Sequence, residues 1–212
     1  EPFLQLPTRK KLLICTAAIP RGTLHEASLG AFYQQYRHEL ATFEVHHIIH
    51  LDDPHALKSS FSADETEKLL QQLIPPSVHL KIIRSKKSSF VRAYKKLMRA
   101  ITDLELLDDN TWVWWLEDDW APTGVPSNFL SLISALPASE NYALGLAADA
   151  HLGSFRGGPL MSAAYFQAFF DIQKKGLAND TCDPEKQVRR WLSGKNEKNG
   201  DQQIYRRLGV DA

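Results

Sequence analysis

Hydrophobic and polar positions follow two alternating periods along the chain. Short apolar runs of strand length are each followed by a longer amphipathic stretch of helical period, and this alternation predicts an α/β fold with a mostly parallel sheet flanked by helices. The predicted strands are 11–19, 43–51, 78–84, 111–116 and 142–148. The predicted helices are 24–40, 63–74 (capped by Ser62 or Asp64), a helix from Ser88 or Ser89 to about 107, 127–136, 162–173, 183–192 and a last one from 201.

Length and composition fit one compact globular domain over residues 1–212. The 212 residues are 43% hydrophobic and 24% charged, with a formal net charge of zero, which gives no electrostatic steering toward nucleic acid or membranes. Two cysteines cannot form a disulfide framework, so we expect Cys15 in the core and a reducing, cytoplasmic setting. No apolar stretch is long enough to span a bilayer, and the start lacks signal-peptide features. Because it also lacks an initiator Met, we expect a chain that is processed or cut from a longer one.

The most informative stretch follows the strand predicted at 111–116. That apolar run leads directly into Glu117, Asp118 and Asp119. If the chain stays extended there, Glu117 and Asp119 point to the same side, in the crevice where open α/β sheets bind ligands. Hard divalent cations take oxygen ligands, and Mg²⁺ is typically held by one or two carboxylates plus substrate phosphates. The sequence therefore indicates Mn²⁺ or Mg²⁺ at Asp119 and Glu117, with a solvated acidic turn as the alternative.

Two further polar segments end predicted strands at the same edge. Asp52 and Asp53 follow the second strand, where a carboxylate could bind a base or a ribose. The first strand leads into a turn with small side chains, which would admit a ligand to the backbone, and with an arginine for phosphate. It is neither a P-loop nor a dinucleotide fingerprint. An ordinary turn explains either segment equally well. The candidate ligand-binding residues in the first strand and its turn are Thr16, Ala17, Ala18, Pro20 and Arg21.

Basic residues line the helix predicted from about 88 to 107. Arg92 lies near its start, where a positive charge opposes the helix dipole unless an anion is close, and this favours a ligand role for Arg92. We interpret Lys95, Lys96 and Arg99 as a solvated face. The histidines at 46, 47 and 50 invite a zinc interpretation, which we reject because a strand turns His47 away from the other two and no acid is interleaved as in a helical zinc motif.

Aromatic and turn-forming residues suggest a second binding region, for an acceptor molecule such as a sugar. Trp112 and Trp114 are expected in the core, whereas Trp115 or Trp120, beside the acids, could stack on a sugar ring. Gly157 and Gly158 lie in a turn-rich loop that would allow close backbone approach.

Asp183 and Glu185 open a predicted helix. There they could be caps alone, or one of them could act as the general base for an acceptor hydroxyl. Three other acids compete for that role: Asp149, Asp180 and Asp201.

Taken in order, these motifs resemble a GT-A glycosyltransferase. The resemblance runs over nearly the whole chain, although the acidic motif has Glu in its first place. It implies a nucleotide-binding part over about 8–120 and an acceptor-side part over about 121–212. The chain also resembles the N-terminal glycosyltransferase domain of multidomain proteins encoded by chlorella viruses. That likeness implies a UDP-sugar donor with L-rhamnose as leading candidate, a role in viral capsid glycan synthesis, and the host cytoplasm as location.

The function that the resemblance implies is metal-dependent transfer of a sugar from a UDP-sugar to a glycan hydroxyl. Asp119 and Glu117 would hold the metal, Asp118 would orient the ribose or the donor sugar, and Asp183 or Glu185 would act as base in an inverting enzyme. Whether the enzyme inverts or retains stays open. Two alternatives also stay open: a Mg²⁺-dependent nucleotidyltransferase, and a non-catalytic module that binds a nucleotide or a glycan.

Overall fold

A computed structural model of the protein describes residues 9–52, 61–86, 90–119, 129–145, 160–168 and 206–209. Within these ranges, strands form one seven-stranded sheet in the order β3-β2-β1-β4-β6-β5-β7. The strands are β1 (Lys11–Ala18), β2 (Glu44–Asp52), β3 (His79–Ser85), β4 (Thr111–Trp115), β5 (Tyr142–Gly145), β6 (Leu160–Ser162) and β7 (Arg206–Gly209). The helical segments are η1 (Glu26–Gly30), α1 (Ala31–Gln35), α2 (Arg37–Leu40), α3 (Ala63–Leu73), α4 (Phe90–Asp103) and α5 (Phe129–Ala135).

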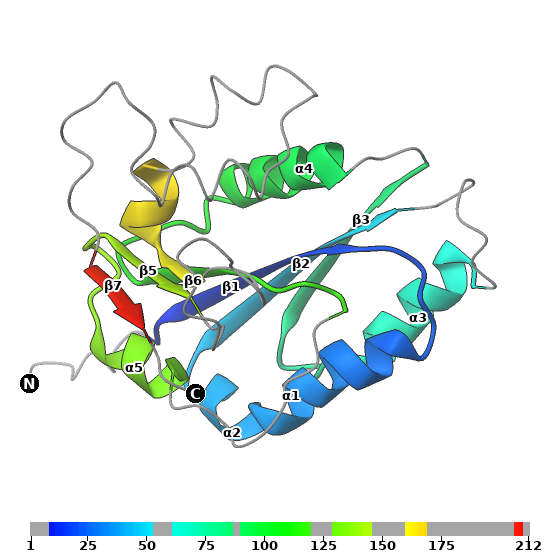
Figure 1. Cartoon of the computed structure of the whole chain (residues 1–212), viewed down its shortest axis with the longest axis horizontal. Helices are drawn as coiled ribbons and strands as arrows, with labels where there is room; N and C mark the ends of the chain where they lie inside the picture. Colours follow the sequence, from blue (N-terminus) through cyan, green and yellow to red (C-terminus); the bar gives the residue numbers. More distant parts are fainter. Residues whose placement is uncertain are drawn as a thin grey trace, which may run out of the picture.

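The sheet is mixed but mostly parallel. β1 pairs in parallel with both β2 and β4, and β2 with β3. β6 runs antiparallel between β4 and β5, and β5 pairs in parallel with β7. Helices lie on both faces, with α4 on one side and α1, α2 and α3 on the other (Figure 1). The α/β fold class predicted from the alternating pattern is therefore confirmed.

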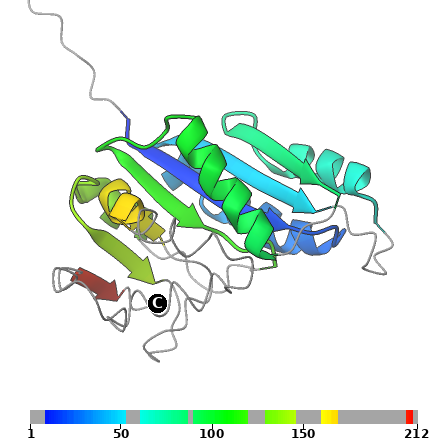
Figure 2. The same ribbon diagram turned by 90° about the horizontal axis from the view of Figure 1, so that it is seen from above.

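Two hydrophobic cores hold the layers together. Successive side chains of β1 point to opposite faces, so Leu12 and Ile14 enter one core and Leu13 and Cys15 the other. The first core packs against η1, α1, α2, α3 and α5, and the second packs against α4, which crosses the sheet in Figure 2. Burial on both faces explains the uninterrupted apolar run of β1.

The tryptophans of β4 behave largely as predicted. Trp112 and Trp114 are buried in the first core, and the ring of Phe32 meets Trp114 edge-on with centroids 4.9 Å apart. Cys15 is buried in the second core, where burial raises the pKa of its thiol far above the usual value. These residues support the fold and carry no chemistry of their own.

Helix boundaries follow the sequence with local differences. Ser62 caps α3 in a capping box with Glu65, as one of the two predicted caps. The helix expected over 24–40 forms, but it contains the π-helical segment η1 and is interrupted at Tyr36. α4 ends at Asp103, earlier than predicted, and Glu105 takes a left-handed backbone with φ of 50°.

In the second half of the chain one predicted helix is confirmed and another is wrong. The helix predicted at 162–173 forms over 163–168, one residue later than expected, and residues 160–162 before it form β6. The last helix, expected from residue 201, is replaced over Arg206–Gly209 by β7. Both strands are too short to show a period, and they form because each pairs with β5.

The predicted helix at 183–192 lies outside the described residues. Among the helices that are described, none is long and apolar enough to cross a membrane.

The central position of β1 yields a prediction for stability. Leu13 is 1% exposed between the sheet and α4, whereas Leu104 is 37% exposed beyond the end of α4. Leu13→Ala should lower the free energy of unfolding by about 3 kcal/mol, because it removes buried methyl groups and leaves a cavity. Chemical denaturation measures the change. Leu104→Ala is the control for the same chemical change and should cost less than about 1 kcal/mol; equal losses in the two variants would contradict this packing.

Candidate functional site

The turns that follow β1 and β4 meet at the carboxyl edge of the sheet. Cys15 pairs with Trp115 in the parallel ladder, and the amide of Leu116 donates to the carbonyl of Cys15 at 3.0 Å. This pairing carries Glu117, Asp118 and Asp119 next to the turn that contains Ile19 and Arg21. The carboxyl edge of such sheets is where ligands bind in open α/β folds.

Asp118 points inward and ties the two turns together. Its Oδ2 accepts a hydrogen bond from the amide of Ile19 at 3.1 Å and lies 3.3 Å from Nε of Arg21. The hydroxyl of Ser28, from η1, donates to the carbonyl of Asp118 at 2.5 Å. Asp118 is 4% exposed, and this burial raises its pKa to about 6 although the guanidinium of Arg21 and the amide of Ile19 both favour the ionised form.

Asp119 points outward and shares the same arginine. Its Oδ2 lies 2.9 Å from Nη1 of Arg21, and both side chains are partly exposed. Arg21 thus bridges a buried and an exposed carboxylate, while half-buried Glu117 adds a third acid to the turn. The carboxylates of Asp119 and Glu117 supply oxygens of the type that hard divalent cations bind.

A buried histidine fixes the turn after β1 through a hydrogen bond to its backbone. The carbonyl of Ile19 accepts a hydrogen bond from Nε2 of buried His25 at 3.0 Å, and burial lowers the pKa of His25. Because a carbonyl only accepts, Nε2 carries the proton of this ring. Gly22 has φ of 58°, and an added Cβ there would lie 2.2 Å from the ring of Phe61. Glycine is therefore required at this bend.

Other first-strand candidates face the interior. The hydroxyl of Thr16 is buried against Nε2 of His47 at 2.9 Å, and the hydroxyl of Tyr33 lies 2.8 Å from the other nitrogen of that ring. Burial lowers the pKa of His47 to about 3, so this histidine is neutral. Ala18 and Pro20 are buried, and Ala17 is half-buried against the second core. Among these named candidates, Arg21 is the one with a charged side chain that is partly exposed.

A second polar group lies at the ends of β2 and β3. Nε2 of buried His50 lies 3.0 Å from the hydroxyl of Ser85, which also accepts a hydrogen bond from the ammonium of Lys96. Nδ1 of His50 lies 3.7 Å from the carboxylate of Asp52. Burial, and secondarily the charge of Lys96, lowers the pKa of His50 to about 4.

Most of this second group was not predicted as a site from the sequence. Asp52 was a predicted site residue, His50 entered only in the rejected zinc set, Ser85 was not named, and Lys96 was assigned to a solvated face. Lys96 is exposed, as predicted, but its ammonium also reaches Ser85 at the end of β3, and Arg92 is exposed on the first turn of α4. The sequence signal for this pair was a serine at the end of one predicted strand and a lysine on the helix that follows it. That combination is too common to indicate a site without the fold.

Trp115 lies between the core and the site. Its ring stacks on Tyr94 of α4 with centroids 4.5 Å apart and planes 19° apart. This contact covers one face of the indole and places Trp115 on the α4 side of the sheet. The remaining named candidates, Asp53, Gly157, Gly158, Asp183 and Glu185, lie outside the described residues.

The backbone bends at the acidic motif. β4 ends at Trp115, and Asp118 and Asp119 form a turn, so the extended arrangement considered for 117–119 does not occur. The three acids are not gathered as one ligand set. Over the ranges that the structure describes, the single group of at least three potential metal ligands within 4.8 Å of one another is Glu44, His46 and His79, at the opposite edge.

Comparison with known proteins assigns no family. No known protein family matches the chain, and no curated protein matches it. Among solved structures, the chain is similar to a 4-diphosphocytidyl-2C-methyl-D-erythritol synthase, with a TM-score of 0.46 and 10% identity over 85% of this chain and 84% of that one. It is also similar to the apo-form of the glycosyltransferase GlyE of Streptococcus pneumoniae TIGR4, with a TM-score of 0.48 and 16% identity over 95% of this chain and 45% of that one. The chain thus spans less than half of GlyE, and likenesses with TM-scores below 0.5 assign it no function.

The buried carboxylate of Asp118 predicts a characteristic pH dependence. Its pKa of about 6 in the folded protein exceeds the ordinary value of 3.8, so the folded state binds this proton more tightly than the unfolded chain. The resulting stabilisation is complete below pH 3.8 and is lost as the pH rises to about 6, by about 3 kcal/mol. Asn cannot ionise. Asp118→Asn should therefore stabilise the protein relative to the natural chain by about 2–3 kcal/mol more at pH 7 than at pH 4.

Denaturation at several pH values measures this difference. The buried histidines are present in both proteins, so their contributions cancel. Asp119→Asn is the matched control, because it removes the other carboxylate of Arg21 from an exposed position. An Asp118→Asn difference that is constant between pH 4 and pH 7 would show that this carboxyl is not held in a burial-dominated environment.

Proposed function

We propose that the protein is a metal-dependent glycosyltransferase of the GT-A type, which moves a sugar from a UDP-sugar to a hydroxyl of a glycan acceptor. The observation that carries the proposal is the contact of Arg21 with Asp118 and Asp119. This contact joins the turn after β1 to the acidic turn after β4 at the carboxyl edge of the sheet. A phosphate-binding cation and a metal-binding carboxylate are thereby adjacent, as transfer from a nucleotide diphosphate sugar requires.

The donor atoms of the acidic turn fit a hard divalent cation. Asp119 is exposed and Glu117 is half-buried, and both supply the oxygen ligands that Mn²⁺ and Mg²⁺ prefer. A cation held there would neutralise charge on the departing diphosphate. Asp118 is already engaged with the amide of Ile19, so we assign it the positioning of the turn in addition to the donor contact predicted from the sequence.

Arg21 is the side chain that can exchange partners at this site. Its guanidinium contacts Asp119 from a third-exposed position, and guanidinium groups bind phosphate as readily as carboxylate. We assign Arg21 to the donor phosphates, with Arg92 as a second positive contact. Asp52 would accept hydrogen bonds from the base or the ribose, and the neighbouring His50, Ser85 and Lys96 hold that end of β2 and β3 in place.

The finer parts of the proposal come from the resemblance of the sequence. These are the UDP-linked donor with L-rhamnose as leading sugar, a base at Asp183 or Glu185, and an acceptor loop at Gly157 and Gly158 with Trp115 nearby. The same resemblance supports a role in viral capsid glycan synthesis in the host cytoplasm, within a multidomain chain.

Thermal-shift measurements with nucleotides test the donor class. UDP, GDP and CMP are each added with and without Mn²⁺. UDP with Mn²⁺ at about 100 times its Kd should raise the Tm by roughly 5–10 °C, because a ligand that binds only the folded state stabilises it by about 2.7 kcal/mol. UDP alone should raise the Tm much less. A nucleotide shift of the same size without Mn²⁺ would contradict the metal, and a preference for GDP or CMP would contradict the UDP donor.

Substitution of Asp119 tests the enzyme itself. Asp119→Ala should lower Mn²⁺-dependent release of UDP from a UDP-sugar by at least about a hundredfold, because a metal ion contributes several kcal/mol to transition-state stabilisation. Asp109→Ala removes an exposed acid from the turn at the other end of β4 and should keep full activity.

The same assay separates the alternatives. Full activity in Asp119→Ala would end the proposal. Diphosphate release from a nucleoside triphosphate would indicate a nucleotidyltransferase, and donor binding without turnover would indicate a binding module.

A further inference from the structure

The amino ends of β2 and β3 bring three metal-ligand side chains together. Glu44 and His46 are two residues apart on β2, so they point to the same face of the sheet. His79 begins β3 and is the register partner of His46 in the parallel ladder. Their ligand atoms all lie within 4.8 Å of one another. The cluster therefore follows directly from strand register.

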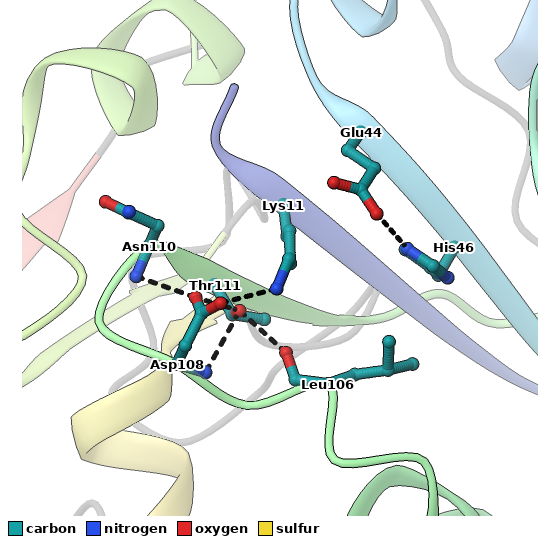
Figure 3. Close-up of polar contacts among 7 residues, drawn as sticks. All are labelled: Lys11, Glu44, His46, Leu106, Asp108, Asn110 and Thr111. Atoms are coloured by element: carbon teal, nitrogen blue, oxygen red, sulfur yellow. Dashed lines mark hydrogen bonds and ion pairs between the residues drawn. The ribbon is translucent and has the colours of Figure 1, made fainter. Parts of the chain in front are cut away.

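The three side chains already face one another. Nε2 of His46 lies 2.8 Å from Oε1 of Glu44, and Figure 3 shows the two pointing toward each other from β2. The imidazole rings of His46 and His79 are stacked, with centroids 4.6 Å apart and planes at 26°. Glu44 and His46 are half-buried and His79 is exposed, so solvent and ions reach the group.

We propose that Glu44, His46 and His79 form a binding site for a divalent transition metal of the Zn²⁺ class. Two imidazoles and one carboxylate are a common zinc ligand set, in which water takes the fourth position. Tetrahedral bonds of about 2.1 Å place ligand atoms about 3.4 Å apart, so metal binding would turn the two imidazole rings out of their present stack to point their nitrogens at one ion. Imidazole ligands disfavour Mg²⁺ and Mn²⁺, so this site differs in chemistry from the acidic turn.

The surrounding charges permit a cation here. Lys11 is the register partner of Glu44 on β1, but its ammonium is bound by Asp108 at 2.5 Å, as Figure 3 shows. Lys81, two residues after His79, is exposed. The charge of Lys11, the register partner of Glu44, is thus neutralised by Asp108.

The site is separate from the proposed donor site. Asp52 is eight residue steps after Glu44 along β2, which at about 3.3 Å per step puts them roughly 26 Å apart. A metal here would therefore not take part in transfer. It would join the end strand β3 to β2, and its role would be to stabilise the sheet.

Titration of the metal-free full chain with Zn²⁺ tests the proposal. At low micromolar concentrations, Zn²⁺ should raise the Tm of the natural protein, whereas Mg²⁺ should not. His79→Gln should weaken Zn²⁺ binding in calorimetry by more than about tenfold, since even loss of a partner that only orients a ligand costs that much. His79 is exposed, so this variant is expected to fold, and Glu44→Gln should have the same effect.

His38→Gln is the matched control, because His38 is an exposed histidine of α2 outside the cluster. It should bind Zn²⁺ like the natural protein. Unchanged Zn²⁺ affinity in His79→Gln, or no Zn²⁺ stabilisation of the natural protein, would overturn the proposal. Mn²⁺-dependent donor turnover should be the same in His79→Gln and the natural protein, so this result is independent of the proposed transferase activity.

Discussion

The hydrogen bond from the amide of Ile19 to the buried carboxylate of Asp118 is the constraint on which the site depends. It fixes the turn after β4 against the turn after β1, and so it determines that Asp119 faces outward beside Arg21. Burying a carboxylate costs free energy, and the raised pKa of Asp118 shows that its hydrogen bond and Arg21 offset only part of that cost. Asparagine could keep the hydrogen bond without the buried charge. A buried ionisable group at this position therefore argues for function, because groups that cost stability concentrate at sites of binding and catalysis.

The parallel register of β1, β2, β3 and β4 gathers the remaining polar residues. Each of these strands ends at one edge, so Arg21, Asp52, Ser85 and the acids reach that edge from four different segments. Lys96 then links α4 to the end of β3. The result is two polar groups, one acidic with a bridging arginine and one built around neutral His50. A ligand with a charged diphosphate and a hydrogen-bonding nucleoside needs two such regions, and a single strand end could not supply both.

Sequence patterns predicted what depends on local periodicity and missed what depends on pairing. β1 and β4 were recognisable because strands buried on both faces are apolar throughout, and α3 because a capping residue precedes it and two prolines follow it. β6 and β7 are short and form through their neighbours, so no local pattern showed them. The same limit applies to the site. Alternation along a strand predicted the directions of Glu117 and Asp119, but β4 ends at Trp115, and in the turn beyond it only the fold decides that Asp118 points inward.

Register also explains why the cluster of Glu44, His46 and His79 was not predicted from the sequence. The rejected set of His46, His47 and His50 was considered along one strand, where alternation does separate His47, and the structure gives His47 and His50 their own buried partners. The third ligand comes instead from β3, which is paired with β2 but separated from it by α3. A parallel sheet thus has two ends with different chemistry. In this protein the carboxyl end presents carboxylates, and the amino end presents imidazoles, so hard and borderline metal ions would not compete for one site.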